Sequence, residues 1–347
     1  MLVPPAVLAL FAVNLSYLLQ GGMPLQAALT LLTRSESSTR FRQLIDQLSK
    51  SVQAGSMLSA AMRKHLNVFG EVSIALVEAA ERDGTLGRSF IDIAELINRE
   101  AASRDQLRNA MAYPLLLCIA VLITLVFMIA YLTPAVKPLL MSVGATPGLI
   151  TQALFWLADD MAVAAASLAL LPGLMCVFFV LSKFNVAARF YWHRCLLSVW
   201  MVGDARRDIL YARLCRVVAR LLDSGWDIDK ALAIANSSIG NLFISDELQK
   251  LRLQMQVGNR FSQSLSVLST APMILEPLMI AAESSGDVAP ALHRAAWQLE
   301  EQANTMLKRF TALVPPFLVC ALGFILLALV VGLLAPIFSS AITMGAS

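Results

Sequence analysis

Three long stretches of the chain contain no Asp, Glu, Lys or Arg and are almost entirely apolar. Their cores are residues 113–134, 161–182 and 314–338. Each core approaches or exceeds the length of about 20 residues that a helix needs to cross the hydrocarbon layer of a bilayer. A helix can do so because it satisfies its own backbone hydrogen bonds. The pattern therefore predicts three transmembrane helices.

The remaining sequence also has the periodicity of helices. In residues 72–80 and 89–97, Ala, Ile, Leu and Val recur at every third or fourth position. This spacing is typical of a helix that packs one face against its neighbours. No run alternates apolar and polar residues as a half-buried strand does. We therefore expect an all-α integral membrane protein.

Composition agrees with this class. The chain of 347 residues is 58% hydrophobic and 15% charged, with a mean hydropathy of +0.69, whereas soluble domains average roughly 45–50% apolar and about 25% charged residues. These values exclude a disordered chain, a secreted disulfide-rich domain and an ordinary cytosolic enzyme. The net charge of +3 is too small to indicate a nucleic-acid partner.

The basic residues predict the orientation in the bilayer. All of the 27 Lys and Arg residues except Lys137 lie in 1–112 or 183–313. Lys and Arg are retained on the cytoplasmic side, so we expect both regions in the cytoplasm. The loop 135–160 and the tail 339–347 are then periplasmic. Residues 1–33 also lack charge and could form a fourth membrane segment, but the repeat described next favours a cytoplasmic helix there.

Two parts of the sequence resemble each other at a nearly constant offset. LLQGGMPLQAAL at 18–29 aligns with LLDSGWDIDKAL at 221–232, an offset of 203. VEAAERDGTL at 77–86 aligns with MIAAESSGDV at 279–288, an offset of 202. Pro114 and Pro316 match at that same offset of 202. The chain is therefore predicted to hold two copies of one helical-bundle domain, in 1–112 and 183–313, each leading into a membrane helix.

Each copy contains two predicted glycine turns. Gly22 and Gly225 lie where one helix must end and the next begin, and Gly84 and Gly286 repeat this arrangement later in each copy. Glycine adopts the left-handed conformation that ends a helix at little cost. These four glycines are therefore expected to set the turns.

Acidic residues surround the later turn of each copy. They are Glu78 and Glu81 in the first copy, and Glu283 and Asp287 in the second. A carboxylate at such a turn can bind backbone donors or a neighbouring arginine, can contact a partner protein, or can act in catalysis. We favour the first role over the second. Catalysis is least favoured, because it needs an acid–base partner at a defined separation.

No other motif indicates chemistry. The five cysteines are widely spaced and the three histidines stand alone, which fits neither a disulfide framework nor a zinc site. The sequence lacks GxxxxGK[ST], GxSxG and HExxH. We therefore predict no catalytic residue, no metal and no cofactor, and a protein that is not an enzyme. The five arginines within 206–220 suggest lipid headgroups, an acidic protein partner or simply a solvated face.

The repeated motifs resemble the inner-membrane platform family of type II secretion systems and type IV pili, often called the F or PilC family. The resemblance spans essentially the whole chain, although Ala80 and Ala282 stand where the family commonly has glycine. It implies a platform beneath a growing fibre that couples a cytoplasmic ATPase to the lifting of pilin or pseudopilin subunits. It also implies contacts with other inner-membrane assembly proteins and the lipid bilayer, and a homo-oligomer such as a dimer. The short N-terminus is similar to type IVb and conjugative thin-pilus members.

Two other classes of protein remain as alternatives to a pilus platform or a secretion pseudopilus platform. A small-solute transporter would need polar residues and broken helices at mid-bilayer, and only Pro172–Gly173 suggests this. A membrane-bound peptidase would need facing carboxylates near the membrane surface. Asp159 and Asp160 are adjacent in one loop and do not form such a pair.

Overall fold

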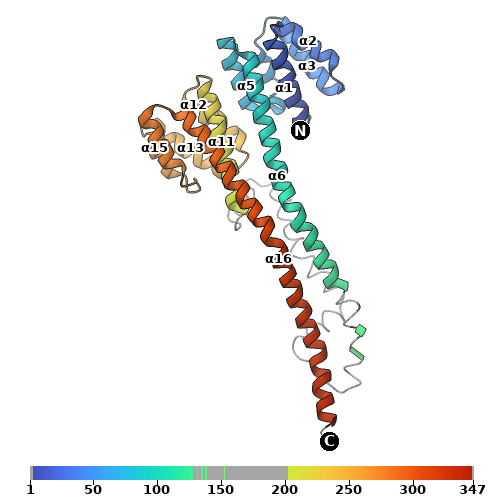
Figure 1. The fold of residues 1–347 in the computed structure, drawn as a ribbon. Coiled ribbons are helices and arrows are strands. Elements are labelled where there is room, and N and C mark those ends of the chain that lie inside the picture. Colours follow the sequence, from blue (N-terminus) through green and yellow to red (C-terminus); the bar gives the residue numbers. More distant parts are fainter. Residues whose placement is uncertain are drawn as a thin grey trace. The chain divides into compact units, whose positions relative to one another are not determined.

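The structure is a computed structural model that describes residues 3–127, 131, 134–135, 137–138, 152 and 202–345. The predicted membrane helix at 161–182 lies outside the described residues, as does nearly all of the loop at 135–160. The chain divides into two compact units, of which one is Met1–Leu107 with His193–Met306 and the other is Arg108–Trp192 with Leu307–Ser347. All regular structure in the described residues is helical (Figure 1).

The first unit contains two series of helices that follow each other in the same order. The first segment (3–107) holds α1 (Pro5–Gln20), α2 (Leu25–Ser35), α3 (Thr39–Gln53), α4 (Leu58–Arg63), α5 (Leu66–Asp83) and the start of α6 (Leu86–Phe127). The second segment (202–306) holds α11 (Val202–Asp223), α12 (Ile228–Ile239), α13 (Leu242–Gln256), α14 (Phe261–Ser264), the 3₁₀ turn η2 (Leu265–Val267), α15 (Leu275–Ser285) and the start of α16 (Val288–Gly345).

The first predicted turn has the same conformation in both segments. Gly22 and Gly225 have φ angles of 81° and 79°. In each turn the residue after the glycine donates its amide to a carbonyl five residues earlier, of Leu18 or Leu221, at 3.0 Å. This bond satisfies a carbonyl that the end of the helix leaves free. Both glycines therefore lie between the end of one helix and the start of the next.

Helix α1 forms part of the core of the first segment. Its Leu8, Phe11, Ala12 and Leu15 are buried. The Phe11 ring meets three further rings, of Phe41 at 5.5 Å and of Phe69 and Phe90 at 6.5 Å each, between centroids. Aromatic side chains bury large apolar areas, and the contacts with Phe41 and Phe90 have the edge-to-face geometry that such pairs favour. The apolar stretch near the N-terminus therefore contributes one face to this core.

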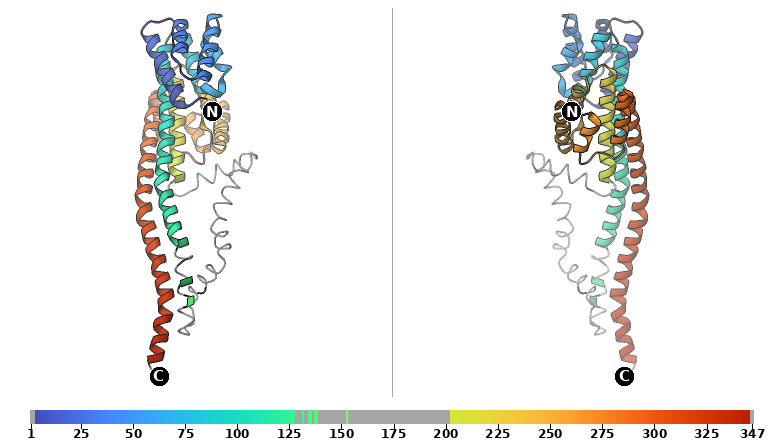
Figure 2. Two further views of the ribbon diagram at one scale, coloured as in Figure 1. Left: turned by 90° about the vertical axis from the view of Figure 1, so that its right-hand side faces the viewer. Right: turned by 90° about the vertical axis from the view of Figure 1, so that its left-hand side faces the viewer.

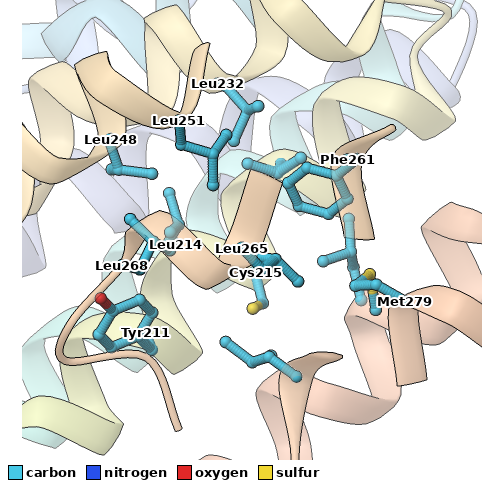
Figure 3. Close-up of a pocket in the computed structure, with 13 residues that line it drawn as sticks. Tyr211, Leu214, Cys215, Leu232, Leu248, Leu251, Phe261, Leu265, Leu268 and Met279 are labelled. Atoms are coloured by element: carbon cyan, nitrogen blue, oxygen red, sulfur yellow. The ribbon is translucent and has the colours of Figure 1, made fainter. Parts of the chain in front are cut away.

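The core of the second segment is aliphatic at the corresponding positions. Leu214 and Leu292 lie where the repeat offset places Phe11 and Phe90. Both line a small cavity of about 20 Å³, which Figure 3 shows among leucine, cysteine and methionine side chains. A space of this size holds at most about one water molecule. It is a packing defect and not a ligand site.

Helices α6 and α16 continue into apolar sequence. Figures 1 and 2 trace α6 and α16 as uninterrupted helices that run past Pro114 and Pro316. Large apolar side chains on α6 are exposed, including Leu115 (63%) and Ile123 (64%), and on α16 Phe324 is 73% exposed. Within the described residues one stretch, Val288–Phe324, is long and apolar enough to cross a bilayer.

Candidate functional site: the acidic turns and the joint between segments

Glu81 connects the end of α5 to the start of α4. Its carboxylate accepts hydrogen bonds from the backbone amides of Leu58 and Ser59 and from the Ser59 hydroxyl; the bond from the Ser59 amide is 3.1 Å long. Three residues later, Gly84 ends α5 with a φ of 70°. The first amides of a helix have no partner within it and favour a negative charge. Glu81 therefore caps α4 from a distant part of the sequence.

Glu283 makes the same connection in the second segment. Its carboxylate accepts from the Ser262 amide at 3.0 Å and from the Ser262 hydroxyl, at the start of α14. Gly286 ends α15 with a φ of 80°. Asp287, in contrast, is exposed at the start of α16. The predicted residues Glu81, Gly84, Glu283 and Gly286 thus occupy one kind of turn, built twice, while the Asp287 side chain lies outside it.

Glu78 belongs to an ionic cluster near this turn. Its carboxylate lies 2.8 Å from the Arg63 guanidinium and also pairs with Arg82. The Arg82 guanidinium in turn stacks 5.4 Å from the centroid of the Trp226 ring. Trp226 follows Gly225, so this stacking joins the first segment to the second.

Contacts between the first and the second segment form a joint between α5 and α6 on one side and α11 with its following turn on the other. The Trp226 indole is the apolar part of this joint. Its Nε1–H donates to the Ala75 carbonyl of α5 at 3.2 Å. Trp226 is half-buried, and an indole N–H that is withdrawn from water usually has an acceptor. A helix carbonyl can accept a second hydrogen bond because it has two lone pairs. The turn of the second segment therefore docks on α5 of the first.

Arginines of α11 form the ionic part of the same joint. Arg220 lies 2.7 Å from Asp92 and 2.8 Å from Glu95 on α6, and Arg213 lies 2.8 Å from Glu100. The sequence suggested that lipid, an acidic partner or solvent would face these arginines. That interpretation is wrong for these two, because their partners lie in the same chain. It is also wrong for Arg216, which pairs with Glu300 on α16.

The joint changes the acidity of its two carboxylates in opposite directions. Burial raises the pKa of Asp92, and the nearby Arg220 charge does not fully offset this effect. Burial alone would also raise the pKa of Glu95, but the Arg99 hydrogen bond and the Arg220 charge bring this pKa below its usual value. Hydrogen bonds and opposite charges favour the ionised form, whereas burial opposes it. Glu95 is therefore the more firmly ionised partner of Arg220.

A buried polar group on α13 was missed by the sequence analysis. The Glu247 side chain is buried and accepts from the Ser269 amide at 2.9 Å and the Thr270 hydroxyl at 2.8 Å. The Tyr211 hydroxyl lies 3.0 Å from the same Thr270 oxygen. A signal for this group is present in the sequence, since at the offset of 203 Glu247 aligns with Leu44 of the first segment. A polar residue at a repeated core position predicts a local hydrogen-bond network.

The described residues contain no group of three or more His, Cys, Asp or Glu side chains placed to hold a metal ion. Burial raises the pKa of the Cys215 thiol to about 12, so this cysteine carries little of the thiolate on which reactivity depends. The geometry of the site is therefore that of helix caps and ion pairs that join helices.

Comparison with known proteins identifies the family. The family model for type II secretion system (T2SS) protein F matches residues 11–134 and 214–336. The chain belongs to this family. Both matches include an acidic turn and run into an apolar helix, and their first residues differ by the offset of 203 found in the sequence.

Related proteins of this family are named for two kinds of machine. The chain is 29% identical to a type II secretion system protein F from Pseudomonas aeruginosa, over 96% of this chain and 82% of the relative. It is 27% identical to a type IV pilus assembly protein PilC from Thermus thermophilus, over 95% and 82%. A PilC from Pseudomonas aeruginosa is 22% identical over 97% and 90%. These names describe assembly and secretion proteins.

Proposed function

We propose that this family member is an inner-membrane platform protein of a type IV pilus assembly machine, of the type IVb kind. In this role it couples a cytoplasmic assembly ATPase to the addition of pilin subunits and catalyses no reaction itself. The observation that carries the proposal is the double match to the protein F family. Relatives named PilC support the pilus assignment.

The proposed topology follows the charge pattern. Two copies of one domain, 1–112 and 183–313, lie in the cytoplasm, and helices at 113–134, 161–182 and 314–338 cross the membrane. The N-terminus is cytoplasmic, and the loop 135–160 and the tail 339–347 are periplasmic. The exposed apolar side chains of α6 and α16 support two of the three spans, because large uncovered apolar surfaces need a lipid or protein neighbour.

The proposed partners lie in two environments, the cytoplasm and the membrane. The cytoplasmic domains contact the ATPase, and the membrane helices contact pilin helices and other inner-membrane assembly proteins. Glu78, Glu81, Glu283 and Asp287 act by holding or presenting the acidic turns, with Gly84 and Gly286 at their bends. The capping bonds of Glu81 and Glu283 support a conformational role for these two residues.

A pseudopilus platform of a type II secretion system is the second candidate. It is supported by the relative named protein F, which is 29% identical over 96% of this chain. The two candidates differ in the fibre subunit that accompanies the protein. A small-solute transporter is a third and weaker candidate and would move solute without such a subunit.

The first test is affinity purification of the tagged chain from native membranes, followed by mass spectrometry. Recovery of an assembly ATPase and a pilin, both lost when residues 1–112 are deleted, is expected. Recovery of pseudopilins in place of pilin would assign the chain to secretion. Recovery of the chain alone, together with solute flux in liposomes, would overturn the platform role.

A second test uses the acidic turns. The pair Glu81→Ala with Glu283→Ala is expected to abolish fibres while the protein still inserts into the membrane. Glu71→Ala is the matched control, because Glu71 is exposed on α5 and outside the capping bonds. Normal fibres at normal protein level in the double variant would contradict the proposed role of the turns.

A further inference from the structure

The connection between α2 and α3 carries a cluster of cations. Residues 34–42, here called the basic hairpin, contain three exposed arginines, Arg34, Arg40 and Arg42. In the part of the chain that the structure describes, none of the three forms an ion pair. Arg42 donates to the Glu36 carbonyl at 2.8 Å, and the Glu36 carboxylate accepts a backbone amide instead of an arginine. The hairpin therefore presents three positive charges to solvent.

Two of these arginines stand at the unfavourable end of a helix. Arg40 and Arg42 are among the first four residues of α3, whose first turn contains no acidic residue. The N-terminus of a helix carries a partial positive charge, so a cation there lowers the stability of the helix and a carboxylate raises it. Helix stability therefore disfavours these arginines, and departures from such local rules are typical of functional sites.

The second segment shows that this connection does not need the cations to fold. At the offset of 203, the aligned residues of the α12–α13 connection are Ser237, Phe243 and Ser245. The side-chain oxygen of Asn241 caps α13 by accepting the amides of Phe243 and Ile244. At the start of α3, Ser38 makes no such bond. One connection is thus capped and uncharged, while the other is basic and lacks a side-chain cap, so the charge serves something outside the segment.

The position of the basic hairpin favours a partner in water over lipid headgroups. Figures 1 and 2 show α2 and α3 at the end of the first segment where α6 begins. From Leu86 to Leu107, within the same unit, α6 extends about 30 Å. Its apolar sequence starts beyond that point. Interactions between exposed charges are screened over about 8–10 Å at physiological ionic strength, so the hairpin suits a protein in the cytoplasm.

We propose that the basic hairpin docks a carboxylate-rich surface of a cytoplasmic protein partner. Guanidinium groups bind carboxylates through paired, charge-assisted hydrogen bonds. Leu31 lies one turn before Arg34 on α2 and is 47% exposed, so an apolar contact is available beside the charges. The proposed function supplies such a partner, the assembly ATPase, and the inference rests on that function. The contact uses the first segment alone, because the aligned connection in the second segment is uncharged.

Charge reversal in the hairpin tests the contact. The tagged full-length chain is purified from native membranes with Arg34→Glu and Arg40→Glu together, and Arg42 is kept because it also binds the Glu36 carbonyl. We expect the recovery of the ATPase to fall several-fold while the recovery of pilin is unchanged. The matched control, Lys64→Glu with Lys230→Glu, makes the same change of charge at two exposed cations outside the hairpin. Equal recovery of the ATPase by the two variants would overturn the proposal.

Two further measurements separate the contact from an effect on folding. Arg40→Glu places a carboxylate in the first turn of α3, so the charge-reversed chain should unfold at the same temperature as the wild type or at a higher one. In the wild type, recovery of the ATPase should decrease as the salt concentration rises, because salt screens the attraction between exposed charges. Recovery that does not depend on salt would overturn the proposal.

A thiol in the hairpin distinguishes protein from lipid as the partner. Arg34→Cys is made in the full-length chain with its five native cysteines replaced by serine. The protein is reconstituted in vesicles of phosphatidylcholine, with or without phosphatidylglycerol, and labelled with a water-soluble maleimide. Equal labelling in the two kinds of vesicle is expected. Slower labelling with phosphatidylglycerol would assign the hairpin to anionic lipid and overturn the proposal.

Failure of this inference differs from failure of the proposed function. Recovery of the ATPase by the wild type and by the charge-reversed chain alike would reject the contact and retain the platform role. A wild-type purification that yields no ATPase would reject the platform role and, with it, this partner of the hairpin.

Discussion

The Glu81 carboxylate binds both the amide and the hydroxyl of Ser59, a residue 22 positions earlier in the chain. This contact attaches α4 to the end of α5. With six residues, α4 is far shorter than the roughly 12–15 residues at which an isolated helix becomes marginally stable. The short helix therefore depends on a charge supplied from outside its own sequence.

Removing this charge is expected to destabilise the first segment. Glu81→Ala leaves the Leu58 and Ser59 amides without their acceptor, at a cost of about 1–3 kcal/mol in the free energy of unfolding. Chemical unfolding of the detergent-solubilised protein measures the loss. Ser59→Ala should lose less, and the double variant should lose less than the sum of the two, because both remove one shared contact. Strict additivity would show that the two side chains act independently.

The indole of Trp226 is expected to hold the two segments together. Trp226→Phe removes the hydrogen bond to the Ala75 carbonyl and should cost about 1 kcal/mol. Trp226→Ala also removes the ring beneath Arg82 and should cost more than this, by at least the roughly 0.5–1 kcal/mol of an exposed cation–π contact. The measurement is the rate of proteolysis in the joint. We expect cleavage to be fastest in Trp226→Ala, slower in Trp226→Phe and slowest in the wild type. Equal rates of proteolysis in the three proteins would mean that the ion pairs of Arg220 are enough to hold the two segments together.

Exchanging core residues between the segments should change the free energy of unfolding differently in the two segments. One exchange is expected to be costly and the other is not. Phe11→Leu removes the ring that contacts three others and is expected to cost about 1–3 kcal/mol. Leu214→Phe adds volume beside the cavity of about 20 Å³ and is expected to be neutral or slightly stabilising. Thermal unfolding of both variants checks the contrast. A large loss from Leu214→Phe would show that the second core is already filled.

Asp208 is expected to make stability depend on pH. Burial raises its pKa to about 6, although Arg207 acts in the opposite direction; the usual value in an unfolded chain is about 3.9. Between pH 4 and 6 the folded state therefore binds more protons than the unfolded state, so this residue lowers stability as pH rises through that window. The full cost above pH 6 is about 3 kcal/mol.

Asp208→Asn isolates this effect from the other titrating groups. The variant should be more stable than the wild type at pH 7, and the difference should shrink towards zero below pH 4. Unfolding midpoints measured at several pH values give the comparison. A difference that is constant across the series would mean that the carboxyl group titrates normally in the folded protein.

The repeated turns could be predicted from sequence because their cause is local. Gly22 and Gly225 adopt left-handed angles in the structure, as do Gly84 and Gly286. Only glycine does so cheaply, so its position marks the end of a helix. Glu81 binds backbone amides in the structure, but its partners Leu58 and Ser59 lie 23 and 22 positions earlier, so the turn alone does not predict them.

The joint between the segments could not be predicted, because its cause is tertiary. A run of arginines shows only that a face is basic and not what faces it. Arg220 forms an ion pair with Asp92, which is more than a hundred residues away in the sequence. The i, i+4 pairs on α6, such as Glu95 with Arg99, were foreseeable from spacing and are present. The buried Glu247 network required a comparison of the two aligned segments position by position.

The continuity of α6 and α16 has a mechanical consequence. At 1.5 Å per residue, the 42 residues of α6 and the 58 residues of α16 form rods of about 63 Å and 87 Å. Pro114 in α6 and Pro316 in α16 have no backbone N–H to donate, so each helix lacks a hydrogen bond of its ladder at that point. Each helix is therefore expected to bend most easily where its sequence becomes apolar.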